Sequence, residues 1–143
     1  MYEEQVNELY TRALMPGLAH LYSGEEAVPV GMCEALRIDD YITSTHRGHG
    51  RCLAKGASPD RMFAELLGKE AEYCRGKGGS THIADPATGN LGANAIVGGS
   101  VGIGTVVQLW VVRSAMMRTI AVESRENSYF GVFHCCRICP GCG

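Results

Sequence analysis

Residues 39–50 read DDYITSTHRGHG and join a short alternating segment to a loop rich in polar side chains. Residues 41–45 alternate weakly between apolar and polar side chains, which predicts a short β-strand. The strand leads directly into His46, Arg47 and His49, and Gly48 and Gly50 let the loop bend tightly. Arginine presents a planar fork of donors that suits phosphate oxygens, and histidine can donate to phosphate or transfer a proton near neutral pH. One interpretation is therefore a ligand-binding loop, and the other is a polar surface turn.

Two segments in the first quarter of the chain have helical patterns. Apolar side chains in residues 2–14 follow the three- and four-residue spacing of an amphipathic helix. Residues 24–36 predict a second helix, with Glu25 and Glu26 in its first turn, where carboxylates complement the helix dipole. Pro29 removes one backbone donor, so we expect it to kink this helix or delay its start.

A third helix is marked by a hydroxyl residue followed by proline. Ser58 can cap the helix, and Pro59 suits the first helical position because an N–H there would have no partner within the helix. Gly68 suits the C-terminal stop of the same helix.

Glycine becomes frequent between Gly76 and Gly104. Because glycine destabilises helix interiors but lets backbone approach a ligand, we expect an ordered loop here. Residues 76–82, GKGGSTH, lack the residue order of a nucleotide triphosphatase loop, and Gly102-x-Gly104 lacks the third glycine of a dinucleotide fingerprint. The favoured interpretation is a loop that closes over a substrate, with His82 as a polar contact.

Composition limits the classes of function. The chain has 143 residues, 45% of them hydrophobic, which suffices for one compact domain with a core. The net charge of −2 and the lack of a basic run give no sign of nucleic-acid or lipid-surface binding. No uninterrupted apolar run reaches the roughly 18 residues of a membrane helix. Residues 1–4 do not begin a secretory signal, so we expect a cytoplasmic protein.

The last nine residues contain four of the seven cysteines. They are Cys135, Cys136, Cys139 and Cys142, and His134 precedes them. The spacing from Cys139 to Cys142 occurs in zinc and redox sites, so a small metal-binding or redox protein is an alternative function. Structural zinc sites usually pair two such motifs across a loop, whereas all these sulfurs lie close together, which argues against a metal site.

Four stretches of the sequence together resemble one protein family. They are residues 20–27 (HLYSGEEA), 39–50 (DDYITSTHRGHG), 76–82 (GKGGSTH) and 94–99 (NAIVGG). In order and spacing they are similar to the α subunits of the thiamine-diphosphate-dependent first components of 2-oxo-acid dehydrogenase complexes. The acetoin dehydrogenase branch looks nearest, and pyruvate dehydrogenase is next. The resemblance implies the N-terminal portion of an α/β thiamine-diphosphate-binding fold, here truncated.

The resemblance also implies roles for seven residues. They are His20 and His49 as catalytic residues, His46 and Arg47 as contacts to the cofactor diphosphate, Ala95 and Val97 as backbone contacts to its aminopyrimidine ring, and His82 in a loop at the substrate entrance. The implied cofactors are thiamine diphosphate and magnesium. The implied partners are the β subunit and the lipoyl-bearing acyltransferase core. The implied substrate is acetoin or a 2-oxo acid, which is cleaved before its acyl unit passes to a lipoyl group.

Three departures from the family pattern concern the cofactor site. Glu25 stands where members usually have glutamine, and the Cβ of Ala95 intrudes where glycine normally lets backbone approach the ring. The chain contains no Gly-Asp-Gly, the motif that should hold magnesium, so we assign no metal ligand. We therefore expect weak or absent cofactor binding by the chain alone.

The family pattern covers about residues 1–105 and is lost after Thr105. We predict that residues 106–143 are a divergent tail, produced by a frameshifted or misjoined gene. The chain would then be inactive alone. A non-catalytic interaction module that keeps only subunit contacts is a further alternative.

Overall fold

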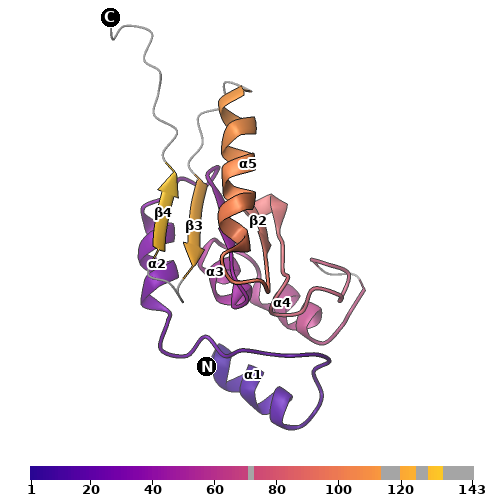
Figure 1. The fold of residues 1–143 in the computed structure, drawn as a ribbon. Helices are drawn as coiled ribbons and strands as arrows, with labels where there is room; N and C mark the ends of the chain where they lie inside the picture. The colour runs from indigo at the N-terminus through magenta and orange to yellow at the C-terminus, as the bar shows by residue number, and fades with distance from the viewer. Residues whose placement is uncertain (71–72, 114–119, 125–128, 134–143) are drawn as a thin grey trace, which may run out of the picture.

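The computed structural model describes residues 1–70, 73–113, 120–124 and 129–133, and Figure 1 shows their arrangement. The elements in chain order are α1 (Tyr2–Thr11), α2 (Ala27–Glu34), β1 (Tyr41–Ser44), α3 (Gly48–Ala54), α4 (Pro59–Leu66), the 3-10 helix η1 (Pro86–Thr88), β2 (Asn90–Ala93), α5 (Gly99–Arg113), β3 (Ile120–Ser124) and β4 (Tyr129–Phe133). None of the helices in the described part of the chain has the length and apolar character needed to cross a bilayer.

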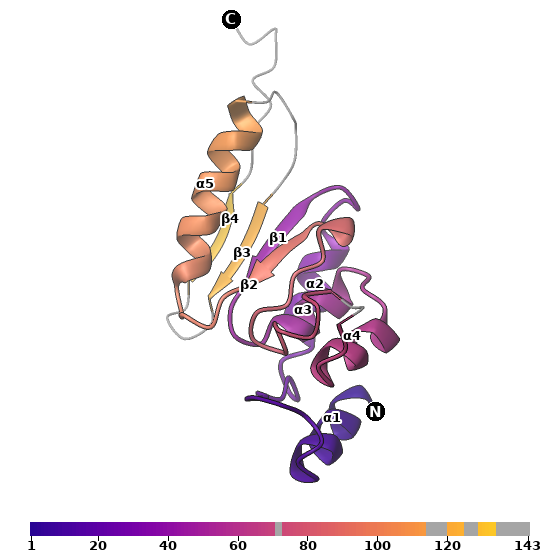
Figure 2. The same ribbon diagram turned by 90° about the vertical axis from the view of Figure 1, so that its right-hand side faces the viewer.

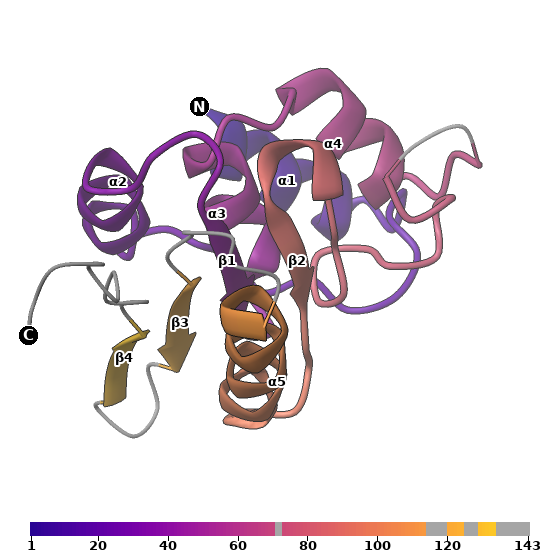
Figure 3. The ribbon, with the colours of Figure 1, turned by 90° about the horizontal axis from the view of Figure 1, so that it is seen from above.

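One sheet with strand order β2-β1-β3-β4 organises the structure. β1 pairs in parallel with β2 and with β3, whereas β3 and β4 are antiparallel. α5 covers one face of the sheet, and α2 and α3 lie on the other face (Figures 2 and 3). Helices on both faces of largely parallel strands are the arrangement expected of an α/β protein.

The predicted strand at residues 41–45 is confirmed as β1. Ile42, Thr43 and Ser44 are all buried, because one face of β1 meets α5 and its two edges pair with β2 and β3. The Thr43 hydroxyl donates to the backbone oxygen of Ser100 in α5 at 3.3 Å. A central strand therefore leads directly into the polar loop that follows it.

The predicted first and third helices are confirmed as α1 and α4. Pro59 occupies the first turn of α4 and Ser58 its N-cap position, although the Ser58 hydroxyl makes no capping hydrogen bond. Gly68 has a φ of +74°, so the chain leaves α4 through a conformation that favours glycine. The turn signals at both ends of α4 were thus sufficient to place it.

The second helix is shorter than expected. α2 begins at Ala27, so Glu25 and Glu26 precede its first turn, and no acidic residue lies within that turn. Pro29 is the third helical residue, where a backbone N–H would have no acceptor within the helix, so the helix continues through it without a lost bond. The two carboxylates make contacts outside the helix instead.

The expected loop from Gly76 to Gly104 is wrong in two places, because β2 spans Asn90–Ala93 and α5 begins at Gly99. Ser100, Gly104 and Val111 are buried and recur at helical spacing on one side of α5. α5 packs against β1 and β3 on the sheet. A glycine within a helix costs about 1 kcal/mol relative to alanine, and this packing offsets the cost.

The opposite side of α5 is apolar and exposed. Val106 and Leu109 are each 67% exposed, and Trp110 is 56% exposed. Figure 2 shows that nothing in the described chain lies over this side of the helix.

Two clusters of buried side chains form the core around α1, α3 and α4. One contains Cys52, Ala57, Met62 and Ile83. The other contains Val6, Met15 and Leu66. Tyr2 packs against both clusters and contacts Phe63, with ring centroids 4.4 Å apart. α1 is therefore attached to α3 and α4 by side-chain packing.

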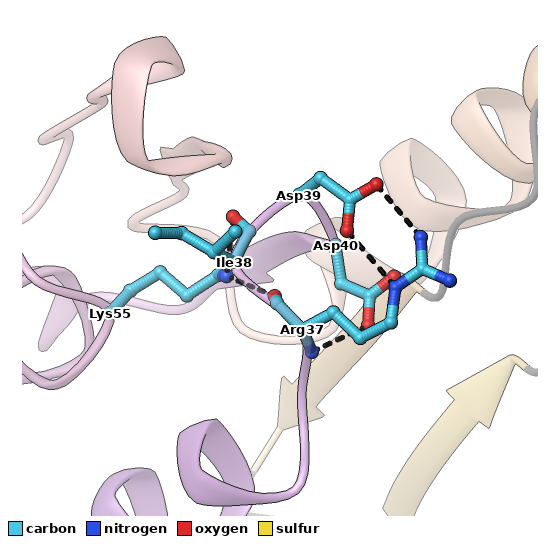
Figure 4. A network of polar contacts seen from close by, with 5 residues as sticks. All are labelled: Arg37, Ile38, Asp39, Asp40 and Lys55. Carbon is cyan, nitrogen blue, oxygen red and sulfur yellow. Dashed lines mark hydrogen bonds and ion pairs between the residues drawn. The ribbon is translucent and has the colours of Figure 1, made fainter.

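A polar network fixes the turn that leads into β1 (Figure 4). Lys55 Nζ donates to the backbone oxygens of Arg37 and Ile38 at 2.9 and 3.2 Å. The Arg37 guanidinium binds Asp39, and the backbone N–H of Arg37 donates to Asp40 at 2.9 Å. These contacts join the end of α3 to the start of β1.

The core assignment predicts unequal effects for two leucines. Leu66 is 1% exposed, so Leu66→Ala should lower the free energy of unfolding by about 2–5 kcal/mol, because it leaves a cavity. Leu14 is 51% exposed, so Leu14→Ala should change that free energy by about 0.5 kcal/mol or less. Urea denaturation monitored by circular dichroism measures both, and equal effects would contradict this core.

Candidate functional site

The loops after β1 and β2 emerge at the same edge of the sheet. The two strands are parallel, so their carboxyl ends are neighbours. The backbone N–H of Asn94 donates to the backbone oxygen of Ser44 at 3.0 Å. The first loop carries His46 and Arg47, and the second carries residues 94–98. In open α/β sheets, ligands bind in the crevice outside the carboxyl ends of the strands.

Two glycines in the first turn of α3, directly after the first loop, allow close packing on neighbouring segments. α3 begins at Gly48, where an added Cβ would overlap the side chain of Ala93 at the end of β2. At Gly50 an added Cβ would overlap the ring of Tyr22, which is buried. Larger residues at either position would push the loop away from β2 or from the segment before α2.

The first loop brings together two histidines that are distant in the sequence. The rings of His20 and His46 lie edge to face, with centroids 4.9 Å apart and an interplanar angle of 81°. His20 is exposed and His46 is half-buried. Their contact places His20, predicted to be catalytic, beside a predicted cofactor contact.

Arg47 forms an ion pair beside this histidine pair. Its Nη1 lies 2.7 Å from Oε1 of Glu25, and the side chains are 30% and 14% exposed. The Nε of Arg47 is buried and has no hydrogen-bond partner in the described structure. The guanidinium thus has a carboxylate on one donor and an unused buried donor on another.

Arg51 supports the loop from within. It is 1% exposed, and its Nη1 donates to Thr45 Oγ1 at 3.3 Å and to the Arg47 backbone oxygen at 3.4 Å. The guanidinium also lies over the Tyr22 ring, 5.4 Å from its centroid. A buried cation therefore fixes the backbone that presents Arg47.

His49 lies inside the protein. It is 0% exposed, and its Nε2 is 3.0 Å from Oε1 of Glu3 in α1. The rings of Tyr2 and Tyr22 lie on either side, with centroids 6.4 and 5.8 Å away. The structure therefore separates His49 from the exposed His20, and its catalytic role remains a prediction.

The pKa of Glu3 reflects this buried contact. Burial by itself would raise it, but hydrogen bonds from His49 and from the Tyr22 N–H, the latter at 2.7 Å, favour the ionised carboxylate and lower the pKa. Burial is also the main reason that the pKa of the neighbouring Tyr2 phenol is raised. The tyrosine stays neutral beside an ionised glutamate.

The second loop presents backbone toward solvent. Ala95 and Val97 are both exposed, and the Asn94 side chain accepts from the Ile96 N–H at 2.9 Å. Gly98 has a φ of +83°, and α5 begins at the next residue. The structure thus brings the loop with Ala95 and Val97 to the same edge as Arg47.

The glycine-rich loop is ordered by a buried carboxylate. Glu65 is 0% exposed and accepts hydrogen bonds from four backbone N–H groups. The donors are Cys74 and Gly76 to Oε2 at 2.9 and 2.8 Å, and Gly78 and Gly79 to Oε1 at 2.8 and 3.3 Å. The loop therefore wraps around Glu65, and His82 follows it at an exposed position.

A pocket of about 250 Å³ lies between this loop and the segment before His20. Lys77, Thr81 and His82 line it on one side, and Leu18 lines it on the other. Ser80 Oγ donates to the Leu18 oxygen at 3.2 Å, which joins the two sides. His82 thus lines a pocket, as an entrance residue would, and its role remains a prediction.

The described residues contain no group of three or more His, Cys, Asp or Glu side chains suited to a metal ion. Cys33, Cys52 and Cys74 are free thiols, and burial raises the pKa of Cys52 to about 12. The cysteine cluster at Cys135 to Cys142 lies outside the described residues. The donors at the sheet edge fit a phosphate anion, because Arg47 keeps an unused buried N–H there, but they do not fit a magnesium ion.

Sequence comparison identifies the family. Residues 1–135 match the family described as Dehydrogenase E1 component. The chain belongs to the dehydrogenase E1 component family. The predicted resemblance is therefore confirmed.

The E1 relatives include two acetoin enzymes and a pyruvate enzyme. The chain is 58% identical over 98 residues to the α subunit of acetoin:2,6-dichlorophenolindophenol oxidoreductase of Bacillus subtilis, covering 68% of this chain and 29% of that protein. It is 50% identical over 97 residues to the same subunit of Cupriavidus necator, with coverage of 68% and 29%. The pyruvate dehydrogenase E1 component α subunit of Rhizobium meliloti is 40% identical over 104 residues, with coverage of 73% and 30%. The chain thus spans under a third of each relative.

The binding partners of three carboxylates in this E1 chain could not be predicted from the sequence. Glu3 lies in α1, Glu25 just before α2 and Glu65 in α4. Their partners lie between 9 and 46 residues away in the sequence. An acidic residue in or beside a predicted helix does not indicate which distant residue it will bind.

The Glu3–His49 contact predicts a specific pH dependence. Since the folded-state pKa of Glu3 is lowered from 4.5, its contribution to stability is present above that pH and is lost as the pH falls below it. Glu3→Gln should therefore reduce the loss of stability that occurs as the pH falls below 4.5. Urea midpoints at several pH values measure this, with Glu4→Gln, an exposed neighbour, as the control. An unchanged pH profile in Glu3→Gln would contradict it.

The Glu65 contacts predict local protection of the glycine-rich loop. Glu65→Gln replaces one acceptor oxygen by a donor, which leaves buried N–H groups unpaired at about 1–3 kcal/mol each. Amide hydrogen exchange of residues 73–82 should be faster, while that of β1 should change less. Asp60→Asn, an exposed change in the first turn of α4, should leave the loop as in the natural chain. Equal exchange in both variants would argue against this role.

Proposed function

We propose that this chain supplies part of the α-subunit site of a thiamine-diphosphate-dependent dehydrogenase that acts on acetoin or a 2-oxo acid. The observation that carries the proposal is the convergence of His20, His46 and Arg47 with the loop at residues 94–98 at the carboxyl ends of the parallel strands β1 and β2. The relatives that bear acetoin and pyruvate names support the choice of substrate class. The chain's low coverage of those relatives makes the activity a proposal.

The diphosphate would be held by the first loop. Arg47 would bind phosphate oxygens through its guanidinium, and His46 would add a second donor. Arg51 would keep the Arg47 backbone in place from its buried position. Because Arg51 and the hydrogen bond from Asn94 to Ser44 already hold the loop, little ordering would be needed when the anion binds.

The cofactor ring would lie along the second loop. The exposed backbone at Ala95 and Val97 would contact the aminopyrimidine, as the family resemblance implies. His20 would face the substrate carbonyl from its exposed position beside His46. When bound, thiamine diphosphate supplies the electron sink for carbon–carbon cleavage, and the protein orients the reactants.

The remaining parts of the site would come from elsewhere. We infer that the β subunit completes the site, that magnesium is held by groups this chain lacks, and that a lipoyl-bearing acyltransferase accepts the product. The boundary near residue 105 and the misjoined tail remain part of this proposal. Resequencing the gene tests them, and an unbroken frame without the Gly-Asp-Gly motif would contradict a frameshift.

The proposal predicts that Arg47 dominates diphosphate binding. Arg47→Gln should weaken binding of thiamine diphosphate by about 10- to 100-fold, because charge-assisted hydrogen bonds contribute about 1.5–3 kcal/mol. Lys77→Gln removes an exposed cation on another loop and should have little effect. Nuclear magnetic resonance titration of the labelled chain measures weak binding directly. Similar affinity in the Arg47 variant and the natural chain would refute the proposed site.

A further inference from the structure

Glu25 is held firmly against Arg47. Its backbone N–H donates to the backbone oxygen of Tyr22 at 3.0 Å, and its backbone oxygen accepts from the Val28 N–H at 3.2 Å. Tyr22 is itself 2% exposed and donates its N–H to Glu3 at 2.7 Å. Backbone hydrogen bonds therefore order the turn that carries Glu25, and this turn holds the carboxylate next to Arg47.

An anion bound at Arg47 would lie close to the Glu25 carboxylate. Glu25 lies just before α2 and Arg47 just before α3, and these two helices pack together on the same face of the sheet (Figure 3). The pair is only partly exposed, at 30% and 14%, so solvent screens it less than it screens a surface pair. A phosphate bound to Arg47 would meet a negative charge that already occupies one of its donors.

We propose that Glu25 competes with phosphate for Arg47 and so lowers the affinity of the site for diphosphate. The inference rests on the proposed function of Arg47. The carboxylate has two effects that can be separated. It orients the guanidinium through a hydrogen bond, and it repels an incoming anion through its charge.

Substitution by glutamine or alanine distinguishes these effects. Glu25→Gln keeps an oxygen that can accept from Arg47 but removes the charge, so diphosphate binding should become about 3- to 5-fold tighter. Glu25→Ala removes both the charge and the acceptor, so its gain should be smaller than that of Glu25→Gln. Glu26→Gln is the matched control, because Glu26 is exposed and accepts from Gly24 N–H, and it should change the affinity less than about twofold.

The experiment is a titration of the isotope-labelled chain with inorganic pyrophosphate and, separately, with thiamine diphosphate. Unphosphorylated thiamine serves as the negative ligand, and dispersion of the amide spectrum verifies that each variant is folded. The expected order of affinity is Glu25→Gln above Glu25→Ala, and Glu25→Ala above or equal to the natural chain. The advantage of Glu25→Gln should shrink as salt is added, because it arises from charge.

The outcomes separate the two proposals. If Arg47→Gln weakens binding but Glu25→Gln does not tighten it, Glu25 does not compete with the anion and the present inference is overturned. If Arg47→Gln has no effect, the proposed function of Arg47 fails, whatever Glu25 does. If Glu25→Gln binds no pyrophosphate at all, the inference is also overturned, because removing the charge then exposes no anion site.

Discussion

The close parallel pairing of β1 with β2 is the constraint on which the rest of the structure depends. It requires α3 to start at a glycine, because a side chain at Gly48 would overlap Ala93. It also joins the two following loops through the bond from Asn94 to Ser44. Without this contact Arg47 and Val97 would belong to separate surfaces, and no shared edge would exist for a diphosphate and a ring.

Buried charged groups then fix loops that contain little regular structure. Arg51 hydrogen-bonds the backbone of the first loop, and Glu65 accepts hydrogen bonds from the amides of the glycine-rich loop. A charge without partners in the interior would be costly, so each of these groups demands the conformation that satisfies it. This requirement explains how loops rich in glycine can be specified by the sequence.

Local signals predicted the parts of the fold that depend on neighbours in the sequence. The proline after Ser58 and the glycine at 68 placed α4, and the alternation at residues 41–45 placed β1. α5 was missed because its stability comes from packing on the sheet, which outweighs the poor helix propensity of its glycines. The resemblance assigned His20 and His46 to one site but did not predict the contact between their rings. The partner of Glu25 could not be predicted either, because long-range ion pairs leave no periodic signal.

The most direct test is a crystal structure of the chain soaked with thiamine diphosphate. The account predicts difference density for the diphosphate beside the Arg47 guanidinium, and density for the ring along the backbone of residues 95–97. Ligand density at another surface, with neither Arg47 nor the second loop in contact, would contradict it. So would a crystal structure in which the loops after β1 and β2 lie on unrelated faces.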